Sequence, residues 1–276
     1  MIRLQDMLRI GADTLQKAGI EEFQLDAWYL LSYCLGISRS EYYLKINDEC
    51  DDDSYSNYKK MIDIRANRVP LQYITGIQEF MGIDFIVNES VLIPRQDTEI
   101  LAELAIKHSA GKKVLDMCTG SGCIAISIAK LGNPCNVTAT DISDEALSVA
   151  KCNAKNNRVD IEFVKSDVWD NIFGAYDIVV SNPPYITPKE LEELMPEVIE
   201  HEPVLALAGG SDGLDFYRQI VKGAGNHIVN GGLIMFEIGC FQAEDVSRIL
   251  FDNGFTDIRV EKDYAGLDRV VWAVRP

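Results

Sequence analysis

The sequence predicts an α/β fold, in which a mostly parallel sheet follows a small all-helical domain. Apolar residues recur at helical spacing through residues 1–75, and from Lys113 onward short apolar runs alternate with amphipathic helical runs. The chain of 276 residues is long enough for a core domain and a small appendage. We therefore expect two domains joined by a linker.

The first domain, residues 1–75, is expected to contain helices only. Its first two helical runs each stop at a glycine, Gly19 and Gly36, as helices commonly do. Ser38 and Glu41 have the spacing of a capping box and predict another short helix. These helices contain no catalytic pattern of their own.

Residues 76–91 are expected to form a linker, because the hydrophobic pattern changes there to the alternation of an antiparallel hairpin. The second domain, residues 92–276, should begin with a helix near Thr98 and continue as a parallel sheet with helices on both faces. Residues 188–203 read as one long polar helix. The last two strands have no helix between them, which predicts one antiparallel strand.

The charge of the chain argues against a nucleic-acid substrate. The formal net charge is −17, and most of the excess follows the first domain. Proteins that hold duplex DNA gain much of their affinity from lysine and arginine, so an acidic body works against that role. Solubility alone is a sufficient explanation of the acidity.

The cysteines and the apolar segments indicate the compartment. Seven cysteines form an odd set without a CxxC pair, so we expect neither disulfides nor a metal site. No signal peptide is evident, and no stretch reaches the roughly 20 apolar residues that a membrane span needs. We expect a soluble protein of the reducing cytoplasm.

A glycine-rich turn, "DMCTGSGCIA", follows the first strand of the predicted sheet. Gly120 and Gly122 allow a tight turn and close approach of a ligand to the next helix N-terminus. Asp141 ends the following strand, where a carboxylate can accept hydrogen bonds from ribose hydroxyls; alone, it could equally cap a helix. The combination predicts an adenosine-containing cofactor, but with Ala125 the glycines also fit the spacing of NAD-binding folds.

The stretch "SNPPYI" ends a later buried strand, where open sheets bind ligands. The Asn182 side chain and a proline carbonyl can accept both hydrogens of a planar NH2 group, and Tyr185 can stack on it. Such a pocket could aim a weakly nucleophilic nitrogen at an electrophilic methyl group. A strand-ending turn is the alternative explanation, and it applies when the motif stands alone.

This stretch resembles the (N/D)PP(Y/F) signature of amino-group methyltransferases that use S-adenosylmethionine. Two families share it: DNA adenine-N6 methyltransferases, and the PrmC/HemK family of release factor glutamine methyltransferases. The chain resembles the second family across almost its whole length. The matching segments are "YITGIQEF", "LIPRQDTE", "SNPPYI", "EPVLALAGGSDGLDFYR" and "DYAGLDRVV".

The resemblance implies a Rossmann-like, seven-stranded, class I methyltransferase domain. It implies transfer of a methyl group from S-adenosyl-L-methionine, which leaves S-adenosyl-L-homocysteine, to the glutamine of the Gly-Gly-Gln motif of peptide chain release factors. The helical domain would bind the release factor. No direct contact with nucleic acid or membrane is implied.

The resemblance also assigns roles to residues of this chain. The turn would hold the methionine end of the cofactor, Asp141 the ribose and the "SDVW" segment the adenine, and the proline-rich motif would bind the target amide. Arg95 and Glu99 would lie beside the site, or form a loop-to-helix salt bridge. The cofactor residues are Cys118, Thr119, Gly120, Ser121, Gly122, Asp141, Asp167, Val168 and Asn182, and the catalytic residues are Asn182, Pro183, Pro184 and Tyr185.

Two positions depart from the family pattern. Cys118 stands where the first glycine of the turn is usual, and it could be a reactive thiol near the cofactor. Gln96 replaces the second proline of the usual "PRPDTE" segment.

Three other functions are compatible with parts of the sequence. A DNA adenine methyltransferase would share the proline-rich motif, but the chain is acidic and has no evident target-recognition domain. An NAD-dependent oxidoreductase would explain only the glycine turn. A non-catalytic adaptor would use the helical domain and leave the "SNPPYI" motif unexplained.

Overall fold

The computed structural model describes residues 2–276 and divides the chain into two compact units. The first comprises Met1–Gly76 and Met195–His201, and the second comprises Ile77–Leu194 and Glu202–Pro276. Among the described residues, no helix has both the length and the apolarity to cross a membrane.

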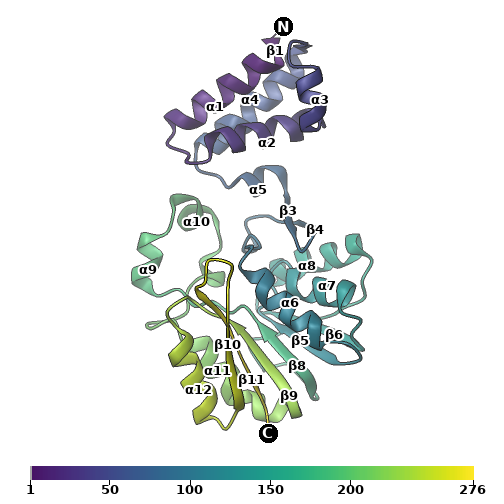
Figure 1. Ribbon diagram of the computed structural model, residues 1–276, viewed down its shortest axis with the longest axis vertical. Coiled ribbons are helices and arrows are strands. Elements are labelled where there is room, and N and C mark those ends of the chain that lie inside the picture. The colour runs from purple at the N-terminus through teal and green to yellow at the C-terminus, as the bar shows by residue number, and fades with distance from the viewer. Residues whose placement is uncertain (1) are drawn as a thin grey trace. The chain divides into compact units, whose positions relative to one another are not determined.

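The first unit is a helical bundle with a short sheet at one end (Figure 1). The expectation of helices only was wrong, because strand β1 pairs antiparallel with β2. The predicted capping box is confirmed, since the Ser38 hydroxyl and Glu41 cap each other's backbone N–H groups. The elements are β1 (Ile2–Arg3), α1 (Leu4–Lys17), α2 (Phe23–Leu35), α3 (Arg39–Leu44), β2 (Glu49–Cys50), α4 (Asp52–Ala66), α5 (Leu71–Thr75) and α10 (Pro196–His201).

Helix α10 belongs to this unit through buried charges. Glu197 accepts hydrogen bonds from Arg65 and Arg68, each at 3.2 Å, and Arg65 also donates to Asp26 at 2.7 Å. The sequence had suggested one helix over residues 188–203, which was wrong. Two short helices form because a residue before a proline disfavours helical dihedrals, and Pro196 starts the second helix.

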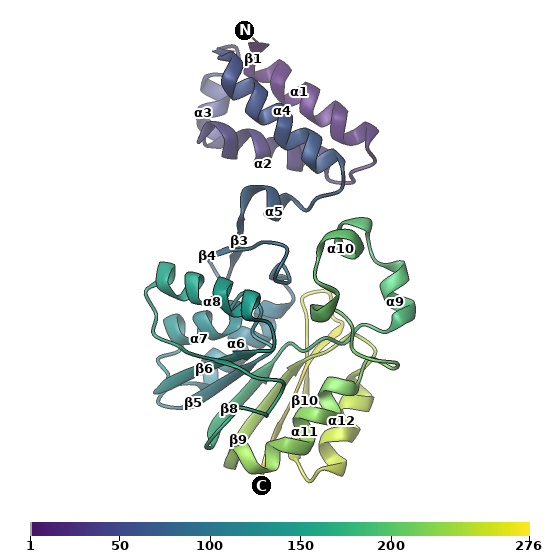
Figure 2. The same cartoon turned by 180° about the vertical axis from the view of Figure 1, so that it is seen from behind.

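The second unit is built on the seven-stranded sheet that the sequence predicted (Figures 1 and 2). The strand order is β10-β11-β9-β8-β5-β6-β7, and only β11 runs antiparallel to its neighbours. The strands are β5 (Lys113–Met117), β6 (Asn136–Asp141), β7 (Glu162–Lys165), β8 (Tyr176–Ser181), β9 (Ile228–Glu237), β10 (Thr256–Lys262) and β11 (Asp268–Val274). The helices are α6 (Thr98–His108), α7 (Cys123–Leu131), α8 (Asp144–Asn157), α9 (Pro188–Glu193), α11 (Asp215–His227), α12 (Ala243–Asp252) and a 3-10 turn, Val204–Ala206.

The predicted hairpin is confirmed as β3 (Ile77–Phe80) paired antiparallel with β4 (Ile83–Ile86). Its turn residues, Met81 and Gly82, both have positive φ, 55° and 71°. Two-residue hairpin turns of this kind match the right-handed twist of the strands.

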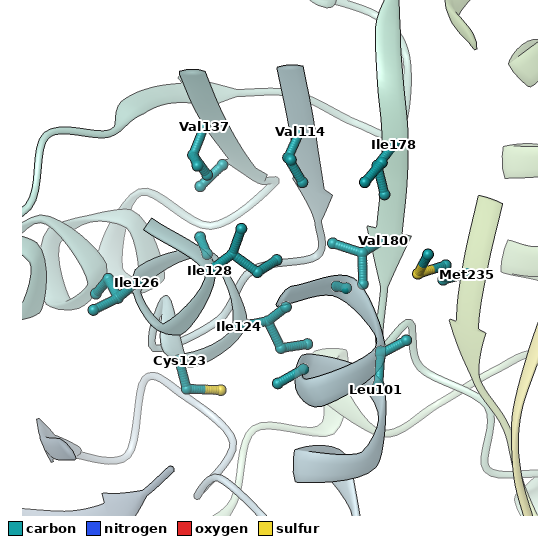
Figure 3. Packing of buried hydrophobic residues seen from close by; sticks show 14 of the residues in the cluster. Leu101, Val114, Cys123, Ile124, Ile126, Ile128, Val137, Ile178, Val180 and Met235 are labelled. Atoms are coloured by element: carbon teal, nitrogen blue, oxygen red, sulfur yellow. The ribbon is translucent and has the colours of Figure 1, made fainter. Parts of the chain in front are cut away.

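Two hydrophobic cores cover the two faces of the large sheet. Successive strand residues alternate between them, so that Val114 joins the core under α6, α7 and α8, and Leu115 joins the core under α11 and α12. Figure 3 shows Leu101 and Ile124 of the first core close to Val180 of the central strand. Burial of both faces explains why the strands read as continuous apolar runs.

A glycine allows α1 and α4 to approach each other closely. A Cβ atom on Gly11 would lie 2.0 Å from the Tyr58 hydroxyl oxygen, and this buried tyrosine also donates to the Ala27 carbonyl. The close packing of α1 against α4 therefore requires a residue without a side chain at position 11.

We expect Gly11→Ala to lower the free energy of unfolding by about 1–3 kcal/mol, because overpacking a tight helix contact forces a shift. Gly225→Ala is the matched control: Gly225 is exposed on α11 with nothing within 4 Å of its added Cβ, so the change should stabilise the protein by up to about 1 kcal/mol. Urea denaturation followed by circular dichroism measures both, and equal effects of the two changes would contradict the account.

Candidate active site

The ends of three neighbouring parallel strands determine where the site lies. Met117 at the end of β5 pairs with Thr140 of β6 on one side and with Ser181 of β8 on the other. The residues that follow these strand ends must therefore lie at one edge of the sheet. Open α/β sheets bind ligands at such an edge.

A cavity of about 460 Å³ lies at this edge, entirely within the second unit. Its wall includes loop residues before α6 and the segment around the 3-10 turn. The predicted site residues that line it are Arg95, Cys118, Thr119, Gly120, Ser121, Asp141, Asp167, Val168, Asn182 and Pro184. Those that do not line it are Glu99, Gly122, Pro183 and Tyr185.

The glycine turn and Asp141 are joined directly. The Gly120 N–H donates to Asp141 Oδ2 at 2.9 Å, and the Ser143 N–H donates to Oδ1 at 3.0 Å. The N-cap of α8 is Ser143, whose hydroxyl accepts from the Ala146 N–H. Asp141 is therefore not the helix cap, and each of its oxygens retains a lone pair for a further donor.

The cavity suits an adenosine-containing cofactor. Gly120 has φ +54°, and nothing lies within 4 Å of the position that a Cβ would occupy there. Gly122 has φ +81° and precedes the first turn of α7, where backbone N–H groups lack intrahelical partners, and that of Ala125 donates to Asp116 at 3.1 Å. Burial raises the pKa of Asp141, as expected for a carboxylate that lies beside an enclosed ligand pocket.

Cys118 adopts the backbone conformation that makes glycine usual at its position. Its φ is +61°, in the left-handed region where a side chain costs on the order of 1 kcal/mol or more. Burial, and then the neighbouring Asp141 carboxylate, raise the pKa of its thiol well above the usual range. The thiol is thus protonated at neutral pH, which argues against a reactive thiolate.

Asn182 and Tyr185 are held by groups that the sequence analysis did not single out. Asn182 Nδ2 donates to the Thr98 hydroxyl oxygen at 3.3 Å, and the Tyr185 hydroxyl donates to Glu237 Oε1 at 3.3 Å. Glu237 is buried at the end of β9, and burial raises its pKa to about 7. The signal that could have revealed it is a single acidic residue in the apolar run "GGLIMFEIG".

Arg95 and Glu99 have separate partners. Arg95 forms an ion pair with Glu202, which also accepts the Ile93 N–H. Glu99 accepts the N–H of Met81 in the hairpin turn at 2.6 Å. Of the two residues, Arg95 lines the cavity and Glu99 does not.

Comparison with known proteins first gives the class of the protein. The methyltransferase small domain matches residues 96–212, and the PrmC N-terminal domain matches residues 6–76. A methyltransferase structure from Pyrococcus furiosus is similar, with a TM-score of 0.57 and 19% identity over 80% of this chain and 98% of that chain. A Thermus thermophilus 16S rRNA N2 G1207 methyltransferase, solved with AdoMet and guanosine, has a TM-score of 0.54 and 16% identity over 72% and 50%. The second unit therefore has a methyltransferase fold.

The sequence relatives then give the family. A release factor glutamine methyltransferase from Clostridium acetobutylicum is 42% identical over 99% of both chains. Another, from Geobacter sulfurreducens, is 41% identical over 93% of this chain and 91% of its own. This chain belongs to the release factor glutamine methyltransferase family, which confirms the resemblance found in its motifs.

The raised pKa of Glu237 predicts a pH dependence of stability. Between an unfolded pKa near 4.5 and a folded pKa of about 7, the folded state binds more protons than the unfolded state at this residue. Its contribution to the free energy of unfolding therefore falls as pH rises through this range, by a total on the order of 3 kcal/mol.

We expect Glu237→Gln to remove this contribution, so that the stability of the wild type relative to the variant decreases from pH 4.5 to pH 7. Urea denaturation of both proteins across the range measures the difference. A difference that stays constant, or that grows with pH, would contradict the buried-carboxyl account.

Proposed function

We propose that this protein transfers a methyl group from S-adenosylmethionine to the side-chain nitrogen of the Gly-Gly-Gln glutamine of peptide chain release factors. One observation carries the proposal: Asn182, followed by two prolines, lines the same cavity as the glycine turn and Asp141. The group proposed to bind the amide and the turn proposed to bind the cofactor thus face the same cavity. The names of the relatives supply the substrate class.

The cofactor would be held by the three strand ends. The turn Cys118 to Gly122 would contact its methionine end, Asp141 would accept the ribose hydroxyls, and Asp167 with Val168 would contact the adenine. When bound, S-adenosylmethionine supplies an electrophilic methyl group on a sulfonium centre. The cavity wall also includes apolar side chains, among them Leu92, Ile142 and Phe216, which suit a planar ring system.

The chain's own contribution to the reaction would be to hold and orient the target nitrogen. The Asn182 carbonyl at the cavity wall and the carbonyl of the adjacent Pro183 would accept its two hydrogens, and Tyr185 would support the planar group from behind, although neither Pro183 nor Tyr185 itself lines the cavity. An amide nitrogen is a weak nucleophile, so fixing its geometry and placing partial negative charge beside it lowers the barrier. As the nitrogen gains the methyl group, one of its hydrogens is lost as a proton.

The helical unit would recognise the release factor. It matches the PrmC N-terminal domain and exposes several large apolar and aromatic side chains, among them Tyr29, Tyr33, Tyr43 and Leu44. Exposed aromatic residues of this kind are common anchors in protein–protein interfaces. We place the recognition domain at residues 1–75, the linker at 76–91 and the catalytic domain at 92–276.

Methyl transfer from labelled S-adenosylmethionine to a purified, full-length release factor tests the proposed function. We expect incorporation into the wild-type factor and none when its Gly-Gly-Gln glutamine is replaced by alanine. Labelling of both factors would move the target elsewhere on the factor. Labelling of neither, with cofactor binding confirmed, would reject release factors as the substrate.

We expect Asn182→Ala to lower the rate of methyl transfer by on the order of 10² or more, because it removes a preorganised acceptor for the target amide. Cofactor affinity, measured by calorimetric titration, should change much less. Turnover close to that of the wild type would refute the role of Asn182.

A further inference from the structure

The turn between β10 and β11 presents an exposed tyrosine on a rigid backbone. Tyr264 is 78% exposed, whereas the preceding residue, Asp263, is buried. Asp263 Oδ1 accepts from the N–H groups of Ala265 and Leu267, at 3.0 Å and 2.9 Å, and the Asp263 N–H donates to the Leu267 carbonyl at 2.8 Å. A carboxylate that binds the backbone N–H groups of its own turn holds that turn in one conformation. Tyr264 and Leu267, which is 46% exposed, are therefore held outward by a fixed backbone.

A second turn, which follows β9, presents an exposed phenylalanine. Phe241 is 92% exposed. The Gly239 N–H donates to Gln242 Oε1 at 2.9 Å, and the Gln242 N–H donates to the Gly239 carbonyl at the same distance. The Gln242 side chain also donates to the Tyr185 carbonyl at 3.2 Å. The turn that carries Phe241 is thus tied directly to the proline-rich motif that follows β8.

Both turns lie at the edge of the sheet that carries the cavity. The end of β9 lies beside the end of β8, because the two strands pair in parallel with Ser181 opposite Phe236. Strand β10 runs parallel to β9, since β11 lies between them and is antiparallel to both. The turn that follows β10 is therefore at the same edge, and Figure 1 shows it in yellow at the end of the sheet away from the C-terminus.

Arg269 connects the turn between β10 and β11 to the cavity wall. Its guanidinium group forms ion pairs with Asp263 at 3.0 Å and with Asp97 at 3.2 Å. Its carbonyl accepts from the Ile238 N–H, directly after β9, at 2.9 Å. Asp97 in turn precedes Thr98, which lines the cavity. The two turns are therefore fixed to the loops that form the proposed site.

We propose that Phe241, Tyr264 and Leu267 form a docking surface for the protein substrate, and that they contact apolar side chains of the release factor beside its Gly-Gly-Gln loop. This inference rests on the proposed function. A folded protein is far larger than a cavity of about 460 Å³, so a release factor whose glutamine enters the cavity must lie against the surface around it.

The side chains of the docking surface suit this contact. Large apolar side chains gathered beside a site are typical of protein interfaces, whereas isolated ones need no explanation. Aromatic side chains on a rigid backbone are frequent anchors, because they bury a large area and lose little conformational entropy on binding. Because the surface belongs to the catalytic unit and lies outside the cavity wall, it should contribute to binding of the release factor and not of the cofactor.

The test compares Tyr264→Ala and Phe241→Ala with Phe173→Ala. Phe173 is 84% exposed but lies just before β8, at the opposite edge of the sheet, so it is the matched control. We expect each change in the docking surface to raise the KM for full-length release factor about tenfold, with kcat and the affinity for S-adenosylhomocysteine within about twofold of the wild type. Phe173→Ala should leave all three unchanged. KM values for the docking-surface variants equal to that of Phe173→Ala overturn the proposal.

Tyr264→Phe separates loss of the ring from loss of the hydroxyl group. It keeps the apolar ring, so we expect its KM for the release factor to stay within about twofold of the wild type. A KM as high as that of Tyr264→Ala would show that the hydroxyl group makes the contact, and would overturn the apolar docking surface.

The competing occupant of the surface is a second copy of this chain. Sedimentation velocity of the wild type and of Tyr264→Ala distinguishes the two occupants, and we expect both proteins to sediment as the same species. A wild-type dimer that dissociates in the Tyr264→Ala variant would assign the surface to self-association and overturn the proposal.

The same measurements keep the two proposals apart. The wild-type protein must methylate the release factor for the proposed function to stand, whatever the variants do. If it does, and Tyr264→Ala and Phe241→Ala keep the wild-type KM, only the docking surface fails. Calorimetric titration of the release factor into each variant makes the same comparison without turnover.

Discussion

The parallel pairing of β5 with β6 and β8 is the constraint on which the rest of the catalytic unit depends. It brings the ends of three strands to one edge of the sheet, although the residues that follow them, from Cys118 to Asn182, span more than 60 positions of the chain. The hydrogen bond from the Gly120 N–H to Asp141 then ties two of the loops together. Without this register, the glycine turn and the Asn182 motif could not share a cavity.

The edge of the sheet carries buried acidic groups beneath the residues that face the cavity. Asp116 accepts from the Thr119 hydroxyl at 2.6 Å and from the Ala125 N–H at 3.1 Å, which fixes the glycine turn from below. Burial raises its pKa to about 7, as it does for Glu237. Burial of these carboxyl groups lowers the free energy of unfolding at neutral pH. Their hydrogen bonds hold the loops above them in one conformation.

The sequence predicted the parts of the molecule that have local patterns. The hairpin turn, the capping box at Ser38, the start of α6 and the strand–helix alternation all depend on residues within a few positions of each other. The assigned roles of the site residues stay predictions, but the structure gathers most of those residues around one cavity.

The partners of the site residues could not be predicted, because they lie far away in the sequence. Arg95 pairs with Glu202, Asn182 bonds to Thr98, and Tyr185 bonds to Glu237, and no periodicity records such contacts. The break between α9 and α10 was also missed, although Pro196 is a local signal for it.

The central claim is that the three strand ends form one site for a cofactor and a glutamine amide. A crystal structure with S-adenosylhomocysteine and a peptide containing Gly-Gly-Gln tests it most directly. The account predicts the ribose at Asp141 and the glutamine NH2 group between the carbonyl oxygens of Asn182 and Pro183. A cofactor bound away from the glycine turn, or a glutamine side chain directed away from Asn182, would contradict it.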